Sequence, residues 1–148
     1  MIVEKLKELG YEYQPANLKV LDFQQAVKVG NLVFTSGQTP LLNGEGAKGK
    51  VGKDVDMETA YRAAEVCAYK CLQALGAVAD INDVVRIVKV LGMVNVGEGF
   101  TNTSGVINGA THLLNKLFPD KGHARSAVGM QIPNDWAVEI EMVIEVKS

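Results

Sequence analysis

The sequence predicts an α+β fold in which two main helices pack on one face of a mixed β-sheet. Two segments, 57–75 and 106–118, carry apolar residues at helical spacing, and segments rich in β-branched residues lie before, between and after them. The resulting order is helix, β-β, long loop, helix, β, helix, β-β. Two helices cover only one sheet face, so the other is left to solvent or to a partner chain.

The elements before residue 57 follow from local patterns. Ile2, Leu6 and Leu9 lie on one face of a short amphipathic helix. Strands are expected over 20–29 and 32–36, joined at Gly30-Asn31, because both of these residues tolerate positive φ. Residues 43–53 hold four glycines without a phosphate-binding pattern and are read as a loop.

Helix 57–75 is expected to start at the N-cap Asp56 and carries Cys67 and Cys71 on one face. This face is assigned to the core, and buried free thiols are the favoured reading. A metal site is set aside, because nothing gives the two histidines ligand spacing.

The remaining strands are expected over 84–96, 124–131 and 136–147, the last two around the turn IPND. The final strand alternates clearly, with glutamates opposite its apolar residues. Its apolar side comprises Val138, Ile140, Met142, Ile144 and Val146.

Length and composition restrict the class of protein. The 148 residues are read as one domain, 1–148, with an N-terminal helical extension over 1–19. A net charge of −2 is not the excess of positive charge that nucleic-acid-binding proteins usually carry. No apolar run is long enough to span a membrane, and the N-terminus lacks the apolar region of a signal peptide. A cytoplasmic location is expected.

Arg125, in the stretch HARSAVG, requires solvent, an internal carboxylate or an anionic ligand as its partner. If the IPND turn forms a hairpin, Arg125 and a glutamate of the segment Glu139–Glu141 could share the uncovered face. Spacing alone leaves a salt bridge and a ligand site both open. From the sequence alone, a plain strand-ending turn is the favoured interpretation of Ser36-Gly37, and solvation of a helix accounts for Asn108.

The stretches VGNLVFTSGQTP, HARSAVG and VEIEMVIEV, taken together, resemble the Rid/YjgF family of reactive intermediate deaminases, from about Val20 to Val146. The resemblance implies a chorismate-mutase-like, YjgF-like fold. It also implies a homotrimer whose sheets form a central barrel, with helices outside and sites in clefts between subunits. The N-terminal extension and the segment GEGFTNTSGVINGA resemble a less studied branch of the family.

By the same resemblance, Arg125 holds the substrate carboxylate, helped by the backbone amide of Ala127, and Glu139 positions the hydrolytic water. Ser36, Gly37 and Asn108 line the cleft.

This chain departs from the deaminase pattern in three places. Phe23 replaces a tyrosine, Ala127 replaces a cysteine, and the segment 125–133 is one residue shorter. The loss of the tyrosine hydroxyl leaves the exact substrate open.

The leading hypothesis is hydrolysis of small 2-imino acids, such as those derived from 2-aminoacrylate, to 2-oxo acids and ammonia. It requires no metal or organic cofactor, because an imine carbon is already electrophilic. The alternative is a non-catalytic trimer that binds a small carboxylate and acts as a sensor or interaction module. A third hypothesis, endoribonuclease activity, is disfavoured by the acidic composition.

Overall fold

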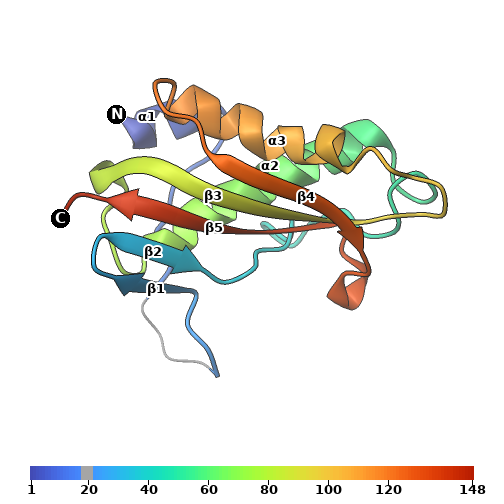
Figure 1. The fold of residues 1–148 in the computed structure, drawn as a ribbon, viewed down its shortest axis with the longest axis horizontal. Helices are drawn as coiled ribbons and strands as arrows, with labels where there is room; N and C mark the ends of the chain where they lie inside the picture. Colours follow the sequence, from blue (N-terminus) through green and yellow to red (C-terminus); the bar gives the residue numbers. More distant parts are fainter. Residues whose placement is uncertain (18–21) are drawn as a thin grey trace.

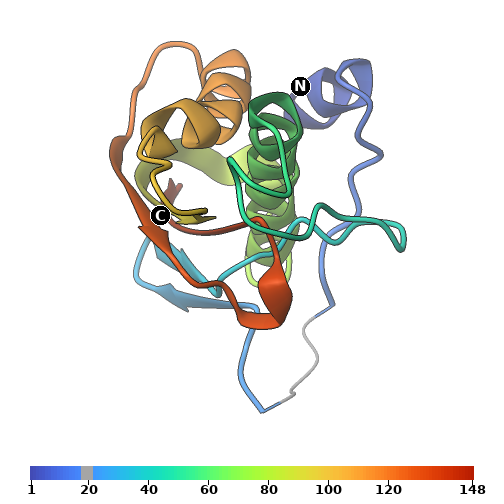
Figure 2. The same cartoon turned by 90° about the vertical axis from the view of Figure 1, so that its right-hand side faces the viewer.

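The computed structural model describes residues 1–17 and 22–148. Its strands form one five-stranded sheet in the order β1-β2-β5-β3-β4, in which only β3 and β4 are parallel. Helices α2 and α3 lie on the same side of this sheet (Figures 1 and 2), which confirms the predicted α+β fold. The elements are α1 Ile2–Glu8, β1 Ala26–Val29, β2 Leu32–Thr35, α2 Met57–Leu75, β3 Val84–Asn95, α3 Thr103–Leu117, β4 Ala124–Met130 and β5 Val138–Val146.

The N-terminal elements are shorter than the sequence patterns predicted. Leu6 is fully buried, whereas Leu9 is 38% exposed because α1 ends at Glu8. The hairpin of β1 and β2 is confirmed, with Gly30 at φ 62° between the paired residues Val29 and Leu32. Strand β1 begins at Ala26 and not at 20; residues 20 and 21 lie outside the described residues, and Phe23 belongs to no strand.

Helix α2 has the predicted bounds, and its N-cap Asp56 accepts a hydrogen bond from the Thr59 amide at 2.8 Å. Cys67 and Cys71 are fully buried, as predicted, and their thiols donate to the carbonyls of Val138 and Ile140. Burial raises the pKa of the Cys71 thiol to about 12 and that of Cys67 well above its ordinary value. Both thiols therefore pack α2 onto β5 and are not poised as nucleophiles.

Helix α3 begins at Thr103, three residues before the predicted start. The cause is Asn102, whose side chain accepts a hydrogen bond from the Gly105 amide at 3.0 Å and so caps an additional turn. Helices α2 and α3 approach closely at Gly109, where a methyl group would overlap the Tyr61 carbonyl oxygen and lie 2.8 Å from its carbon. This close packing places one face of α3 over β3 and β4.

The predicted alternation of the last strand is confirmed. The apolar side of β5 is buried against the helices, and its glutamates occupy the other side. In β3, Ile87, Val90 and Val94 continue the same buried layer. The core is therefore a single layer between the sheet and the two helices. No helix of the described residues is both long and apolar enough to cross a membrane.

The last two strands do not form the hairpin that was considered for the IPND turn. Strand β4 pairs with β3 in parallel, and β3 lies between β4 and β5. The reason is that α3 connects β3 to β4 as a crossover, which returns the chain in the same direction as β3. After β4, the segment Pro133–Asp135, in which Asn134 and Asp135 have positive φ, leads the chain past β3 to β5.

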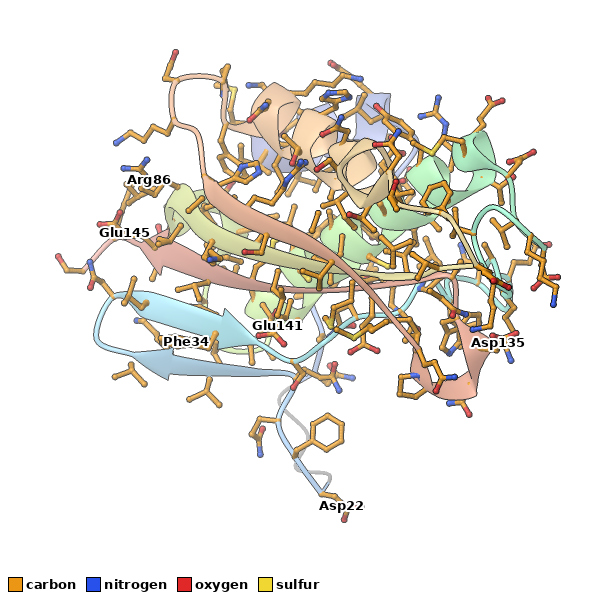
Figure 3. All side chains as sticks on the ribbon, turned by 45° about the vertical axis from the view of Figure 1, so that its right-hand side comes forward. Asp22, Phe34, Arg86, Asp135, Glu141 and Glu145 are labelled. Atoms are coloured by element: carbon orange, nitrogen blue, oxygen red, sulfur yellow. The ribbon has the colours of Figure 1, made fainter. Side chains whose placement is uncertain are left out.

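The sheet side away from α2 and α3, called here the outer face, is not covered by the described residues 1–17 and 22–148. Its exposed apolar side chains come from β1, β2 and β4, and the β5 glutamates lie among them. Figure 3 shows Glu145 near one end of the sheet and Asp135 at the other end. The exposed apolar residues are Val27, Val29, Phe34, Val128 and Met130.

Candidate functional site

Arg125 lies on the edge strand β4 and points toward α3. Its register partner in β3 is Val90, which is buried against the helices. Arg125 Nη1 donates to Asn108 Oδ1 at 2.7 Å and to Thr111 Oγ1 at 3.2 Å. Within residues 1–17 and 22–148 no carboxylate pairs with it. The partly buried guanidinium is thus held by neutral oxygens, not by an internal salt bridge.

The hydrogen-bonded chain continues from Thr111 to His123, the residue two positions before Arg125. Thr111 Oγ1 and His123 Nε2 are 3.1 Å apart. Burial, and then the charge of Arg125, lower the pKa of His123. Sequence reasoning missed Thr111 and His123 as site residues. The available signal was the spacing of Asn108 and Thr111, which places them on the same side of a helix.

Ala127 follows Arg125 on the same side of β4. It is partly buried against the core, and its carbonyl accepts a hydrogen bond from Thr103 Oγ1 at 3.0 Å. Together, Asn108, Thr111, His123, Arg125 and Ala127 form what we call the arginine half-site. Its charge is positive, and in the part of the chain that the structure describes one side of the guanidinium has no hydrogen-bond partner.

Glu139 lies on the outer face of β5 and packs against Gly37. A methyl group on Gly37 would overlap Glu139 Oε2 and lie 3.0 Å from Cδ. The neighbouring backbone is fixed by reciprocal hydrogen bonds between Gln38 and Ile140 at 2.8 and 3.0 Å. Burial, and then the nearby Glu141 charge, raise the pKa of the Glu139 carboxyl. Glycine at position 37 is therefore what makes room for this carboxylate.

Ser36 ties β2 to the segment that precedes β1. Its hydroxyl donates to the Gln24 carbonyl at 2.5 Å, and its amide donates to the Gln25 carbonyl at 2.8 Å. Next to this segment Phe23 is 64% exposed. Its neighbour Asp22 lies on a loop that projects away from the sheet and helices (Figures 1 and 3). We call Phe23, Ser36, Gly37 and Glu139 the glutamate half-site.

The two half-sites lie on opposite faces of the sheet. Arg125 is in register with the core-facing Val90 of β3, whereas Glu139 is in register with Met93. Met93 lies three residues after Val90, an odd number, so the two point to opposite faces. Successive residues of a strand point to opposite faces. The hypothesis that Arg125 and a glutamate share the uncovered face of one chain is therefore wrong. Among the described residues, no three His, Cys, Asp or Glu side chains are grouped as metal ligands.

Comparison with known proteins finds a matching family, a similar curated protein and a similar solved structure. Residues 15–146 match the family described as Endoribonuclease L-PSP. Protein TCP17 of Trypanosoma cruzi is 31% identical over 152 residues, which span 99% of this chain and 95% of that protein. The solved structure of Atu1372 from Agrobacterium tumefaciens, a protein of unknown function, is 36% identical. It covers 99% of this chain and 93% of its own, with a TM-score of 0.89.

A more distant solved structure shares the fold. The structure of TdcF from E. coli with bound serine is 23% identical, covers 90% of this chain and 94% of its own, and has a TM-score of 0.62. The family match over residues 15–146, together with the TSGQTP and HARSAVG stretches on the two half-sites, leads to one conclusion. The chain belongs to the Endoribonuclease L-PSP family, which is also known as the YjgF/Rid family.

Proposed function

We propose that this protein hydrolyses small 2-imino acids, formed from 2-enamino acids such as 2-aminoacrylate, to 2-oxo acids and ammonia. The observation that carries the proposal is the complementarity of the two half-sites. One presents a partly buried cation held only by neutral groups, and the other a partly buried carboxylate with a raised pKa. A carboxylate-bearing substrate that must be attacked by water needs both.

The proposal includes a homotrimer with its sites between subunits. One chain separates the half-sites by the thickness of its sheet, so a complete site needs a second copy. The outer face supports this, because its exposed apolar side chains extend from β1 across to β4. Phe23 is also exposed, on the loop before β1, where a neighbouring subunit would cover it.

In the proposed reaction, Arg125 binds the substrate carboxylate and so orients the imine carbon. The Ala127 amide and Asn108 complete this end of the cleft. Glu139 removes a proton from water as the oxygen attacks the imine carbon and gives this proton to the nitrogen, which forms a carbinolamine. It then moves the hydroxyl proton of the carbinolamine to the nitrogen, the C–N bond breaks as the carbonyl forms, and a 2-oxo acid and ammonia leave. Burial, and then the Glu141 charge, raise the pKa of Glu139, which makes it a stronger base for this exchange.

The remaining residues shape the other wall of the cleft. Ser36 and Gly37 hold the backbone beside Glu139, and Gly37 leaves room for its carboxylate. Phe23 presents an apolar ring to the substrate and offers it no hydroxyl. A small side chain on the imino acid fits this arrangement best. The serine bound by TdcF is a small carboxylate of the same size class.

The test uses 2-aminoacrylate generated in situ, with semicarbazide trapping the free imine. Wild type should suppress trapping. Arg125→Ala should lose this effect, because the carboxylate clamp is gone. Glu139→Gln should lower turnover by about 10²-fold or more while pyruvate still binds, because only the proton transfer is removed.

Two other outcomes have clear meanings. If the wild type binds pyruvate through Arg125 but never changes the trapping rate, the protein is a small-carboxylate-binding module and not a deaminase. If RNA is cleaved by rigorously purified wild type and not by Arg125→Ala, the endoribonuclease hypothesis replaces both.

A further inference from the structure

The guanidinium of Arg125 is oriented by α3 so that one particular edge is left open. Nη1 carries two hydrogens, and its two acceptors, Asn108 Oδ1 and Thr111 Oγ1, both come from α3. In the described part of the chain no protein atom accepts from Nε or Nη2. The Nε–Nη2 edge, with its two parallel N–H groups, is therefore the edge available for bidentate binding of a carboxylate.

The hydrogen bonds of Thr111 link Arg125 to the protonation state of His123. Arginine only donates, so Thr111 Oγ1 must accept from Arg125 and can send its own hydrogen elsewhere. His123 Nε2, at 3.1 Å, is within reach of this hydrogen. When Thr111 donates to Nε2, the imidazole is neutral and carries its hydrogen on Nδ1. If His123 gains a proton, Nε2 becomes a donor, the Thr111 hydroxyl must reverse, and a second positive charge arises beside Arg125.

We propose that Thr111 and His123 are positioning residues of the arginine half-site, and that binding of a carboxylate to Arg125 is coupled to uptake of a proton by His123. This inference rests on the proposed function, because it assumes that the ligand of Arg125 is a carboxylate. It adds a pH-dependent affinity that the motifs of the chain do not imply.

The charges around His123 favour this coupling. On β4 its charged neighbour is Arg125, and on β3 Arg86 Nη2 donates to the carbonyl of the adjacent Gly122 at 3.1 Å. On α3, the residue that contacts the His123 ring is the neutral Thr111. Without ligand, the positive charge of Arg125 opposes protonation of His123. A bound carboxylate cancels that charge, so the protonated imidazole becomes easier to form.

The direction of the pH effect follows from this linkage. If the ligand raises the pKa of His123, the complex binds more protons than the free protein, and affinity increases as pH falls. The dissociation constant for pyruvate, which stays anionic over this range, should decrease by about three- to tenfold from pH 8 to pH 5.5. The pKa of Glu139 is also raised, by burial and then by the Glu141 charge, so the measurement belongs in the Glu139→Gln background, which removes the titration of this group.

The most direct test follows the two histidines of the full-length protein by NMR with and without saturating pyruvate. The pKa of His123 should rise on binding. The second histidine, His112, points toward α2, where its Nδ1 is 2.7 Å from the Tyr61 hydroxyl, and its signal must be told apart from that of His123. The variant His112→Gln assigns the signals. His123→Gln should remove the pH dependence of the pyruvate dissociation constant. Thr111→Val should weaken binding, and Thr111→Ser should restore it.

The possible failures are distinguishable. If pyruvate binds, Arg125→Ala abolishes binding and the pKa of His123 does not move, the coupling is refuted while the carboxylate site stands. If pyruvate does not bind, or binds equally to Arg125→Ala, the carboxylate site is wrong and the coupling falls with it. If Thr111→Val binds as tightly as wild type, Thr111 does not position Arg125.

Discussion

Replacing Gly37 by alanine tests whether the position of the Glu139 carboxylate controls turnover. The added methyl group would overlap Glu139 Oε2, lie 3.0 Å from Cδ and lie 3.3 Å from Cγ. To regain ordinary van der Waals contact the carboxylate must retreat by about 1 Å. A displacement of this size at a reacting group costs about 10²-fold in rate. We therefore expect kcat of Gly37→Ala to fall by about 10²-fold in the 2-aminoacrylate assay.

The same substitution should have little effect on folding. Gly37 does not have a positive φ, and the group that must yield is the end of a flexible side chain. Alanine also reduces the entropy of the unfolded chain, so the free energy of unfolding should change by less than about 1 kcal/mol. Gly122→Ala is the matched control, because a methyl group there meets no atom within 4 Å. Full turnover in a folded Gly37→Ala protein would refute the role of Glu139.

Three further predictions concern pH, assembly and packing. The acidic limb of the pH profile of kcat/KM should lie above the ordinary glutamate pKa of 4.5, because Glu139 must be deprotonated and burial raises its pKa. In Glu141→Gln this limb should move to lower pH, because the Glu141 charge also raises the pKa of Glu139. An unmoved limb would argue against Glu139 as the base. Phe34→Asp, which places a charge on the outer face, should convert the proposed trimer to monomers in light scattering and abolish turnover, and an unchanged mass would contradict the proposed interface. Gly109→Ala should destabilise the protein by about 1–3 kcal/mol in denaturant unfolding, because its methyl group meets the Tyr61 backbone.

Features that depend on near neighbours in the chain could be predicted from the sequence. The bounds of α2, the hairpin at Gly30, the buried cysteines and the alternation of β5 were all predictable, because periodicity, capping and turn chemistry act within a few residues. The start of α3 was missed by three residues, because the capping contribution of Asn102 was not considered. The motifs around Ser36 and Arg125 also identified the family correctly.

The relation between Arg125 and Glu139 could not be predicted in this way. It depends on which strand lies beside β4, and that is decided by the crossover through α3 and by the pairing of β3 with strands on both of its edges. The same placement brings Thr111 and His123 to the guanidinium and leaves Glu139 on the opposite face against Gly37. Sequence by itself determined most of the elements, because local interactions encode them, and its motifs identified the family. Only the tertiary structure decided which side chains meet, because strand order arises from packing between residues far apart in the chain.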